Sequence, residues 1–568
     1  MKLACLRNRL ILHPVLLRVI LVCTHLIPTV LLLYSEPQTL MEKVILSVFT
    51  LGFYVFLFSL HRNAGLIQLL LFPLVFLHAF QIVVFSLFKE SVIAVDMFLN
   101  LMTTNATEAG ELLDNMLPAI GFVCVVYIPV ILLSVVNGLY GVALSTRCQR
   151  KGLAAASVLM VISATLMFLP LRGVHINVWD DLYPVNVFNN LHLAVVKWNK
   201  SETYKNNPPA FSFHARKASV AHRREIYVLV IGEAGRAENW SLSGYPRETN
   251  PELSLMGGLV YYRDAITQAN ATHKSVPLIL SAAHAENFEL LYRQRSVITA
   301  FKESGFTTLF LSNQPPNRSF TDVFAREADH YLNIRQKEGE ELVSQNRYDA
   351  DLLPLLQEYL DTVSGNVFVV FHSYGSHFNY MERYPSDFSY FKPDCFKTVS
   401  ASQRQEMVNA YDNSIRYTDY FLSRLIDILR ATGDCAALYY TTDHGEDLMD
   451  DGRERFLHAS PKPTYHQLHI PMFLWFSEPY RIDFPHRCAN AQTNHNAPTS
   501  TRSSFHTLID MAGIETEYLD TRYSLVSADY TPMSRFYLND HDQSVRWVDS
   551  GLKDCDKDEI NRHGLNTF

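Results

Sequence analysis

Several acidic residues and histidines stand just after short apolar stretches of the chain, where their side chains could bind a metal ion together. In chain order they are Glu233, His372, His377, Asp443, His444 and His458. Carboxylate oxygens and imidazole nitrogens are ligands that zinc takes in proteins. One such residue in a loop is more often solvated or caps a helix, so the argument depends on several of them meeting at one place. We interpret the group as a metal site.

Hydroxyl groups in the stretch TQANATHKSVPLIL (residues 267–280) could supply a nucleophile beside this metal. The candidates are Thr267, Thr272 and Ser275. The letters SVPLIL open an expected helix, and a helix start favours a phosphoryl group. Zinc would lower the pKa of the hydroxyl and polarise a phosphoryl oxygen. Because a simple helix cap explains the same residues equally well, the local sequence leaves the three candidates open.

Short apolar stretches alternate with helical patterns from residue 226 onward. The expected buried strands are 226–231, 307–312, 366–372, 437–442 and 470–476, and the expected helices include 296–305 and 407–433. This alternation predicts an α/β domain with a largely parallel central sheet. In such a sheet a site lies beyond the carboxyl ends of the strands, where the metal-binding candidates fall. His466 and His469 precede the last strand, and we interpret them as structural or peripheral.

The first third of the chain is far more apolar than the rest. Five stretches are long and apolar enough to cross a bilayer as helices, which takes about 20 residues. They are residues 15–34, 44–60, 66–88, 117–140 and 153–171. No small-residue cleavage site follows the first stretch and four more spans do, which argues against a signal peptide.

Basic residues in the short connecting loops predict the orientation of these spans. They are Lys2, Arg7 and Arg9 before the first span, Arg62 after the second, and Arg147, Arg150 and Lys151 after the fourth. The loops 35–43 and 89–116 are net neutral to acidic. Since positive loops stay in the cytoplasm, we expect a cytoplasmic N-terminus and an exported domain after about residue 172.

Three domains are therefore expected. Residues 1–171 form a five-helix transmembrane domain, residues 172–224 an irregular interfacial bridging segment and linker, and residues 225–568 the exported domain. In the bridging segment, Trp179 and Tyr183 suit the membrane interface.

Charge and cysteine content narrow the possible partners and cross-links. The net charge of −8 argues against a nucleic-acid partner. Four of the eight cysteines, Cys395, Cys435, Cys488 and Cys555, fall in the exported part, where disulfides are permitted. Their spacing reveals no pairing.

Together these motifs resemble those of the bacterial inner-membrane phosphoethanolamine transferases, a family within the alkaline phosphatase and sulfatase superfamily. The family includes lipid A-modifying enzymes and mobile colistin-resistance enzymes. VIGEAGRAENWSLSGYPRETNP matches its strand, glutamate and R-A-x-x-x-S-x-x-G-Y-x-R-x-T-x-P pattern, and THKSVP matches T-x-x-S-V-P. HSYGSH matches H-x-x-G-[NS]-H, and FLHASP resembles Y-L-H-G-x-P. The resemblance covers nearly the whole chain, with an inner-membrane part and a periplasmic catalytic domain of alkaline phosphatase/sulfatase-like fold.

The resemblance assigns roles to particular residues. It implies that the zinc ligands are Glu233, Thr272, Asp443 and His444. It also implies that Thr272 is the nucleophile, in preference to Thr267 and Ser275, and that His377 and His458 contact the phosphoryl group or a second zinc. One or two zinc ions are thus expected. In the membrane part, MFLNLMTTNATEAGELL resembles the family's headgroup loop, with Asn100 and Glu108 at matching positions.

The implied reaction moves phosphoethanolamine from phosphatidylethanolamine to Thr272 and then to an acceptor, with lipid A or a related surface glycolipid expected. The added ammonium would lower the negative charge of the surface, so weaker binding of polymyxin and other cationic peptides is a hypothesis. The alternatives are a phosphoglycerol transferase and a membrane-bound sulfatase-like hydrolase of the same superfamily. A sulfatase needs a Cys/Ser-x-Pro-x-Arg stretch, which is missing around Thr272. A non-catalytic sensor of the same fold predicts a broken ligand set, whereas this set is complete.

The chain departs from the family at three places. Gln268 and Leu278 stand where members often have cysteines that flank the nucleophile, and Ala234 stands where they usually have threonine. SNQPPNRS (residues 312–319) also differs from the usual headgroup-contacting stretch. These departures bear on the acceptor more than on the metal ligands.

Overall fold

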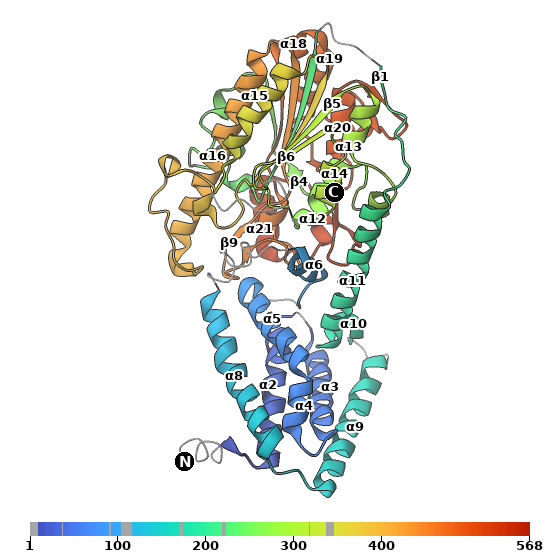
Figure 1. Cartoon of the computed structure of the whole chain (residues 1–568), viewed down its shortest axis with the longest axis vertical. Helices are drawn as coiled ribbons and strands as arrows, with labels where there is room; N and C mark the ends of the chain where they lie inside the picture. The colour runs from blue at the N-terminus through green and yellow to red at the C-terminus, as the bar shows by residue number, and fades with distance from the viewer. Residues whose placement is uncertain are drawn as a thin grey trace. The chain divides into compact units, whose positions relative to one another are not determined.

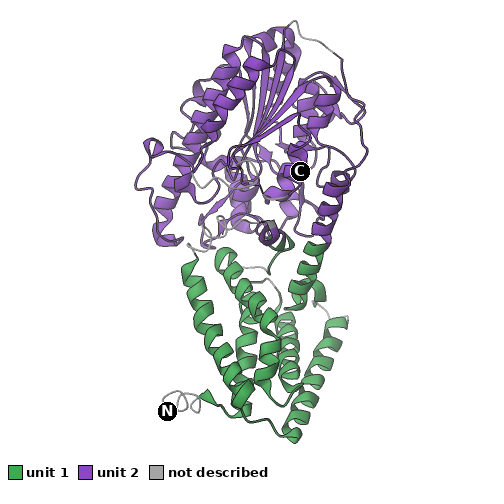
Figure 2. Ribbon diagram, in the orientation of Figure 1, with its two compact units in different colours: residues 1–98, 113–195 green, residues 99–112, 196–568 purple. Residues whose placement is uncertain are grey.

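A computed structural model describes residues 10–36, 38–89, 92–103, 116–169, 174–218, 223–316, 319–336 and 346–567. The chain divides into two compact units (Figure 2): unit 1 comprises Met1–Phe98 and Leu113–Val195, and unit 2 comprises Leu99–Leu112 and Val196–Phe568. The last of the three boundaries between the units, between Val195 and Val196, falls inside helix α11 (Val185–Asn206). The expected domain boundaries at residues 171 and 224 remain predictions.

Unit 1 is built from helices. They are α2 (Pro14–Ser35), α3 (Leu40–Ser59), α4 (Ala64–Leu70), α5 (Phe72–Phe88), α8 (Leu117–Tyr140), α9 (Thr146–Phe168) and α10 (Val178–Asp181), with parts of α6 (Val95–Thr103) and α11. Among the described residues, α2, α3, α8 and α9 are each long and apolar enough to cross a membrane, and α4 and α5 meet the same test only as a pair bent by 67°. The count of spans is thus four, or five if the bent pair is one span. Pro73 in the first turn of α5 lacks the N–H that a continuous helix would need, which accounts for the break.

The bridging segment is more regular than expected. Helix α11 runs for 22 residues, Val185–Asn206, through a stretch that we interpreted partly as irregular chain and partly as linker. Its Asn-rich and Lys-rich composition suggested a loop, but the stretch contains no glycine or proline, and prolines stand only outside its ends, at Pro184 and Pro208. That expectation was wrong.

Two histidines and three tyrosines, His25, Tyr54, His78, Tyr127 and Tyr183, form a buried cluster within unit 1. The ring of His78 lies 4.8 Å from that of His25 and 5.5 Å from that of Tyr183. The Tyr54 hydroxyl lies 3.1 Å from His78 Nε2. Tyr183, expected at the membrane interface, is instead only 2 % exposed, because its ring packs on His78.

Unit 2 contains a seven-stranded sheet. The strand order is β3 (Leu259–Tyr262), β11 (Met472–Phe476), β8 (Cys435–Thr442), β2 (Glu225–Gly232), β7 (Val367–His372), β5 (Thr307–Ser312) and β6 (His330–Asn333). All five predicted strands are confirmed within a few residues, and so are the two named helices, as α13 (Val297–Glu303) and α16 (Arg404–Ala431). Figure 1 shows α15 (Leu353–Thr362) and α16 on one side of the strands and α13 and α20 (Ser503–Met511) on the other. Cover on both faces explains why β2, β7 and β8 are buried along their whole length.

The sheet is mixed, with β11 reversed relative to its neighbours. The four pairings from β8 through β2, β7 and β5 to β6 are parallel, whereas β11 runs antiparallel to both β8 and β3. A parallel connection needs a crossover, usually a helix, that returns the chain to the opposite edge. Between β8 and β11 the chain has only β9 (Asp447–Leu448), β10 (Phe456–Leu457) and the four-residue α17 (Tyr465–Leu468). It therefore enters β11 from the edge where β8 ended.

The described cysteines form no disulfide. Cys23, Cys124, Cys148, Cys395, Cys435, Cys488 and Cys555 are all free. At the position of one expected family cysteine, the buried Gln268 accepts a hydrogen bond from the Ala285 backbone N–H at 2.9 Å.

Candidate active site

Loops that follow adjacent strands bring the predicted metal ligands together. β8, β2 and β7 are neighbours in the sheet, and their carboxyl ends lie at one edge. Glu233 directly follows β2, and Asp443 and His444 directly follow β8. Thr272 is the first residue of α12 (Thr272–Leu280).

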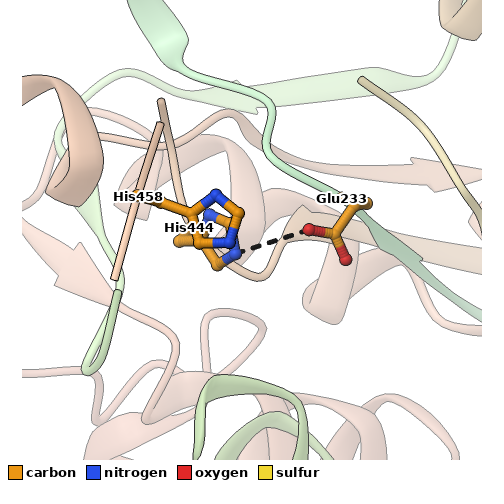
Figure 3. Close-up of side chains that lie close together, drawn as sticks. All are labelled: Glu233, His444 and His458. Atoms are coloured by element: carbon orange, nitrogen blue, oxygen red, sulfur yellow. Dashed lines mark ion pairs between the residues drawn. The ribbon is translucent and has the colours of Figure 1, made fainter. Parts of the chain in front are cut away.

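The four side chains are in contact. The Thr272 hydroxyl lies 3.1 Å from His444 Nε2 and donates to Glu233 Oε1 at 3.4 Å. His444 Nε2 lies 3.4 Å from Glu233 Oε1 and 3.2 Å from Asp443 Oδ2. One oxygen atom each of Thr272, Glu233 and Asp443 therefore lies within 3.4 Å of His444 Nε2, and Figure 3 shows the approach of His444 to Glu233.

Hydrogen bonds behind the ligands fix how they point. His444 Nδ1 lies 2.9 Å from the Gly445 carbonyl, so Nδ1 carries the proton and Nε2 presents a lone pair to the site. Asp443 Oδ1 accepts from the backbone N–H groups of Ala234 and His444, at 3.1 and 2.8 Å. Asp443 Oδ2 receives no hydrogen bond although it is buried, and it faces His444 Nε2. This oxygen is placed as a metal ligand would be.

The charges of the site also fit a divalent cation. Burial, then the neighbouring Asp443 and Glu446, hold the pKa of Glu233 well above its usual range. Burial lowers the pKa of His444 to about 4, so the imidazole is neutral and its Nε2 lone pair is available. Three neighbouring buried carboxyl groups, those of Glu233, Asp443 and Glu446, are costly to ionise together unless a positive ion joins them. Zinc fits this set of oxygen and nitrogen donors.

His458 joins the same group. One ligand atom each from Glu233, His444 and His458 lies within 4.8 Å of the others, and the rings of His444 and His458 are 3.9 Å apart (Figure 3). His458 Nδ1 lies 3.2 Å from Glu446 Oε2, which leaves Nε2 for the site. Burial lowers the pKa of His458 to about 4. Glu446 was not predicted: it is part of DHGED, but nothing in the local sequence shows that it orients His458.

The two histidines of HSYGSH take different places. The His377 ring stacks on Tyr374 at 4.8 Å, and burial, then Arg383 and His458, hold its pKa well below the usual range. His377 is therefore neutral beside His458. His372, the last residue of β7, instead packs in the core against Phe310, with ring centroids 6.5 Å apart, so the structure does not bring it to the metal ligands.

The structure separates the three candidate nucleophiles. Thr267 is fully buried, and its hydroxyl donates to the Asp443 carbonyl at 2.6 Å. The Ser275 hydroxyl donates to the carbonyl of Ala271, the residue that precedes α12, at 3.1 Å. Of the three, Thr272 is the one whose hydroxyl contacts Glu233.

Gln314 supports Glu233 from the stretch that departs from the family pattern. Its Nε2 donates to Glu233 Oε2 and to the Ser373 carbonyl, both at 2.9 Å. Gly375 approaches the same glutamate: a Cβ there would lie 2.7 Å from the Glu233 carbonyl oxygen, and its φ is +46°. Only the position of Gln314, just after a strand of the same sheet, could have suggested its role from the sequence.

Non-glycine residues beside the site adopt the left-handed backbone region. The φ angles are +53° at Ala234, +67° at Leu457 and +58° at Ala459. These residues flank Glu233 and His458. Such strain collects where surrounding contacts fix a backbone for function.

His466 and His469 form a buried ion-pair group with Glu238, just before β11. His469 Nδ1 lies 2.5 Å from Glu238 Oε1, and His469 Nε2 lies 2.8 Å from the Arg263 carbonyl. Glu238 Oε2 lies 3.7 Å from His466 Nδ1. None of these contacts involves a predicted metal ligand, which agrees with the structural interpretation of both histidines. Both histidines precede β11, which runs antiparallel to β8 and therefore begins at the edge of the sheet where β8 ends. They lie near the candidate site for this reason.

The structure describes one of the two predicted headgroup residues. Asn100 lies in α6 (Val95–Thr103), and the segment Leu99–Leu112 is assigned to unit 2. Glu108 lies outside the described residues. Their roles remain proposals.

The sulfatase family profile matches residues 225–514, and the chain belongs to that family. The chain is similar to phosphoethanolamine transferase EptA of Escherichia coli K12, with 33% identity over 52% of this chain and 54% of that protein. It is also similar to the Kdo(2)-lipid A phosphoethanolamine 7''-transferase of the same strain, with 29% identity over 47% of this chain and 46% of that protein. The match spans about half the length of these relatives. The resemblance to phosphoethanolamine transferases expected from the motifs is thus confirmed.

Solved structures agree with these matches. The periplasmic domain of EptC from Escherichia coli, in complex with Zn, is 26% identical, with a TM-score of 0.54 over 59% of this chain and 95% of that domain. The integral membrane lipooligosaccharide phosphoethanolamine transferase A of Neisseria meningitidis is 20% identical, with a TM-score of 0.72 over 89% of this chain and 98% of that protein. At that identity the second match shows the fold alone.

Proposed function

We propose that the protein is a zinc-dependent phosphoethanolamine transferase with Thr272 as its nucleophile. The carrying observation is the contact of the Thr272 hydroxyl with the buried His444 and Glu233, at 3.1 and 3.4 Å, beside the neighbouring carboxyl groups of Asp443 and Glu446. Relatives similar to half of the chain bear the name phosphoethanolamine transferase, and a solved relative contains zinc.

Glu233, Thr272, Asp443 and His444 would hold the zinc ion, with His458 and His377 available to the phosphoryl group or a second ion. When bound, zinc would lower the pKa of the Thr272 hydroxyl and polarise a phosphoryl oxygen. The residues behind the ligands then act by orientation: Gln314 holds Glu233, and the Gly445 carbonyl holds His444. The start of α12 favours the phosphoryl group beside Thr272.

In the first half-reaction, Thr272 Oγ1 attacks phosphorus, and the bond from phosphorus to the diacylglycerol oxygen breaks. The lipid alcohol takes up a proton as it leaves. In the second, an acceptor oxygen attacks, the bond between phosphorus and Thr272 breaks, and Thr272 recovers its proton. Neutral His458, with Nδ1 held by Glu446, would accept the acceptor's proton at Nε2.

Phosphatidylethanolamine is the proposed donor and lipid A, or a related glycolipid, the proposed acceptor. The name of one relative refers to Kdo(2)-lipid A, and unit 1 holds helices long and apolar enough to anchor the enzyme where both lipids lie. We further propose that the N-terminus is cytoplasmic and that unit 2 is periplasmic. Polymyxin resistance would follow from the added ammonium groups.

Peptide mass spectrometry tests this function. With phosphatidylethanolamine but no acceptor, the full-length protein should accumulate phosphoethanolamine on the peptide that carries Thr272, and Thr272→Ala should abolish both adduct and transfer. Ser275→Ala, a hydroxyl removed one turn further along the same helix, should still form the adduct. An adduct on another residue, or undiminished transfer by Thr272→Ala, would refute the assignment of Thr272 as the nucleophile. If only phosphatidylglycerol gives an adduct, and the adduct is phosphoglycerol, the donor is phosphatidylglycerol and not phosphatidylethanolamine.

A further inference from the structure

Gln467, in α17 (Tyr465–Leu468), uses its whole side-chain amide inside unit 2. The residue is fully buried. Its Nε2 donates to Asp447 Oδ2 at 2.6 Å and to the Leu457 carbonyl at 3.4 Å. Its Oε1 accepts from Asn270 Nδ2 at 2.7 Å and from the Ser460 hydroxyl at 3.1 Å. Two donated and two accepted hydrogen bonds are all that a glutamine amide can make.

The hydrogen bond from Asn270 connects Gln467 to the loop of the nucleophile. Asn270 stands two residues before Thr272 and is itself fully engaged. Its Oδ1 accepts from the Tyr537 hydroxyl at 2.7 Å, and its Nδ2 also donates to the Ser460 carbonyl at 2.9 Å. Its backbone carbonyl accepts from the Ala459 N–H at 3.0 Å. The position of Asn270, and with it the start of α12, is therefore set by its contacts with Gln467 and the His458 loop.

A second contact reaches the loop of the metal ligands after β8. Asp447, three residues after His444, also accepts from the Thr464 hydroxyl through its other oxygen, at 2.5 Å. The Gln467 carbonyl accepts from the Gly445 N–H at 2.9 Å. Gly445 is needed for this approach, because a Cβ there would lie 2.0 Å from the His466 carbonyl oxygen.

The remaining contacts reach the loop of His458 from both sides. The Leu457 carbonyl and the Ser460 hydroxyl flank that histidine in sequence, and Gln467 bonds to each. Leu457 and Ala459 have positive φ angles that most residues avoid, so this backbone depends on external contacts to keep its form.

We propose that Gln467 is a positioning residue that holds the loops of Thr272, His444 and His458 in register for phosphoryl transfer. It touches neither the reacting atoms nor a metal ligand's side chain, and acts through Asn270, Asp447 and Ser460. The inference deepens the proposed function and rests on it for the reaction, while the geometry of the loops stands by itself. A buried amide that loses a hydrogen-bond partner destabilises the folded protein, so each of the four hydrogen bonds contributes to holding the loops.

The first test removes the amide. Gln467→Leu in the full-length protein should lower the rate of adduct formation at Thr272 by about 10- to 100-fold, and should make zinc easier to remove with a chelator by a similar factor. Gln294→Leu is the matched control: Gln294 is a buried glutamine of the same unit, and its Oε1 makes no hydrogen bond. The control should fold and react within about threefold of the unaltered protein.

The second test reverses one hydrogen bond. Gln467→Glu keeps the acceptor for Asn270 and Ser460 but sets a second carboxyl group against Asp447 Oδ2. That oxygen also lies 3.6 Å from Arg455 Nε, and His466 and Asp450 act on the same carboxyl group. The activity of this variant should fall as pH rises and the proton shared by the two carboxyl groups is lost. When Asp447→Asn is added, the new amide at position 447 donates to the carboxylate at position 467. The hydrogen bond is thereby restored in the opposite direction. The double variant should recover most of the rate and lose the steep pH dependence, because two residues that share a hydrogen bond couple.

Adduct formation and zinc retention by Gln467→Leu equal to those of the Gln294→Leu control would overturn the positioning role. So would additive losses in the Gln467→Glu, Asp447→Asn pair. If the unaltered protein forms no adduct on Thr272, the proposed function fails instead, and zinc retention in the same variants still decides whether Gln467 orders the site.

Discussion

Asp443 divides its two carboxylate oxygens between two tasks. Oδ1 accepts from the backbone N–H groups of Ala234 and His444 and so joins the loops after β2 and β8. Oδ2 is left without a donor and faces His444 Nε2. A carboxylate oxygen buried in this way is costly unless a cation or a donor reaches it. The same residue therefore builds the loop and offers a ligand atom to the metal.

The first prediction separates these tasks. Asp443→Asn keeps one acceptor oxygen for the two N–H groups but replaces the ligand oxygen by an amide, so the fold should persist while zinc content and transfer fall at least about 100-fold. Glu233→Ala and His444→Ala should be as damaging, because each removes a ligand of the same ion. His466→Ala should cost less than about tenfold. Elemental analysis together with transfer assays on lipid A measures both effects.

His466 serves as the control because it pairs with Glu238 and Asp450, at 3.7 and 3.9 Å, and with no predicted ligand. Loss of activity by His466→Ala as large as that by His444→Ala would show that the histidines were sorted wrongly. Full zinc content and activity in Asp443→Asn would remove Asp443 from the ligand set.

At the scale of elements, buried ion pairs join the turn after β2 to the segment before β11. Glu238 belongs to the short helix η1 (Ala237–Asn239) and meets both His466 and His469. Arg236 pairs with Asp450 at 2.7 Å in the same group. Burial opposes protonation of His466, but Asp450 and Glu238 outweigh it and raise its pKa to about 9.

The second prediction follows from that shift. A histidine whose folded pKa lies above its ordinary 6.5 stabilises the fold fully below about pH 6.5 and loses this contribution as pH rises through about 9. The thermal midpoint of unit 2 in the full-length protein should therefore fall between these pH values. His466→Gln, which cannot titrate, should flatten this part of the profile. An equal slope in the variant would show that His466 is not the group that titrates.

The elements also show what could be predicted from the sequence. β2, β7 and β8 were predictable because strands buried on both faces read as continuous apolar runs. The direction of β11 was not, because it depends on the path of the chain after β8 and not on the strand's own residues. Helix α11 was missed because its polar composition outweighed the absence of glycine and proline.

The sequence could predict ligands of the site that follow strands, but not the residues that hold these ligands in place. Glu233, Asp443 and His444 could be named because they directly follow strands that the apolar pattern reveals. Gln314 and Gln467 act through side-chain hydrogen bonds between segments far apart in the chain, such as Gln467 to Asn270. A glutamine has no sequence signature for that role. His372 was grouped with the ligands by its position after apolar residues, yet it is still part of β7 and packs on Phe310.

At the scale of the whole molecule, the folding boundary of unit 2 matters for any soluble form of the protein. The sequence suggested that the catalytic domain begins near residue 225. The second compact unit resumes at Val196, and residues before 225 supply part of its main hydrophobic core. Tyr204 packs on Phe320 with ring centroids 4.8 Å apart, and its hydroxyl donates to the Gln294 carbonyl at 2.7 Å. Phe213 is fully buried and packs on Phe505 and Tyr518.

The third prediction is that a fragment of residues 196–568 folds as a soluble zinc protein and is more stable than one of residues 225–568. Removing a buried Phe side chain from a core costs about 3–5 kcal/mol, and the shorter fragment loses both Phe213 and Tyr204. It also loses β1 (Arg216–Lys217), which pairs with β13 (Ile514–Glu515). An intermediate fragment of residues 207–568 keeps Phe213 and β1 but lacks Tyr204, so its urea midpoint should lie between the other two. Equal midpoints for the three fragments would show that the segment before residue 225 adds nothing to the stability of the core, and the domain would then begin where the sequence suggested.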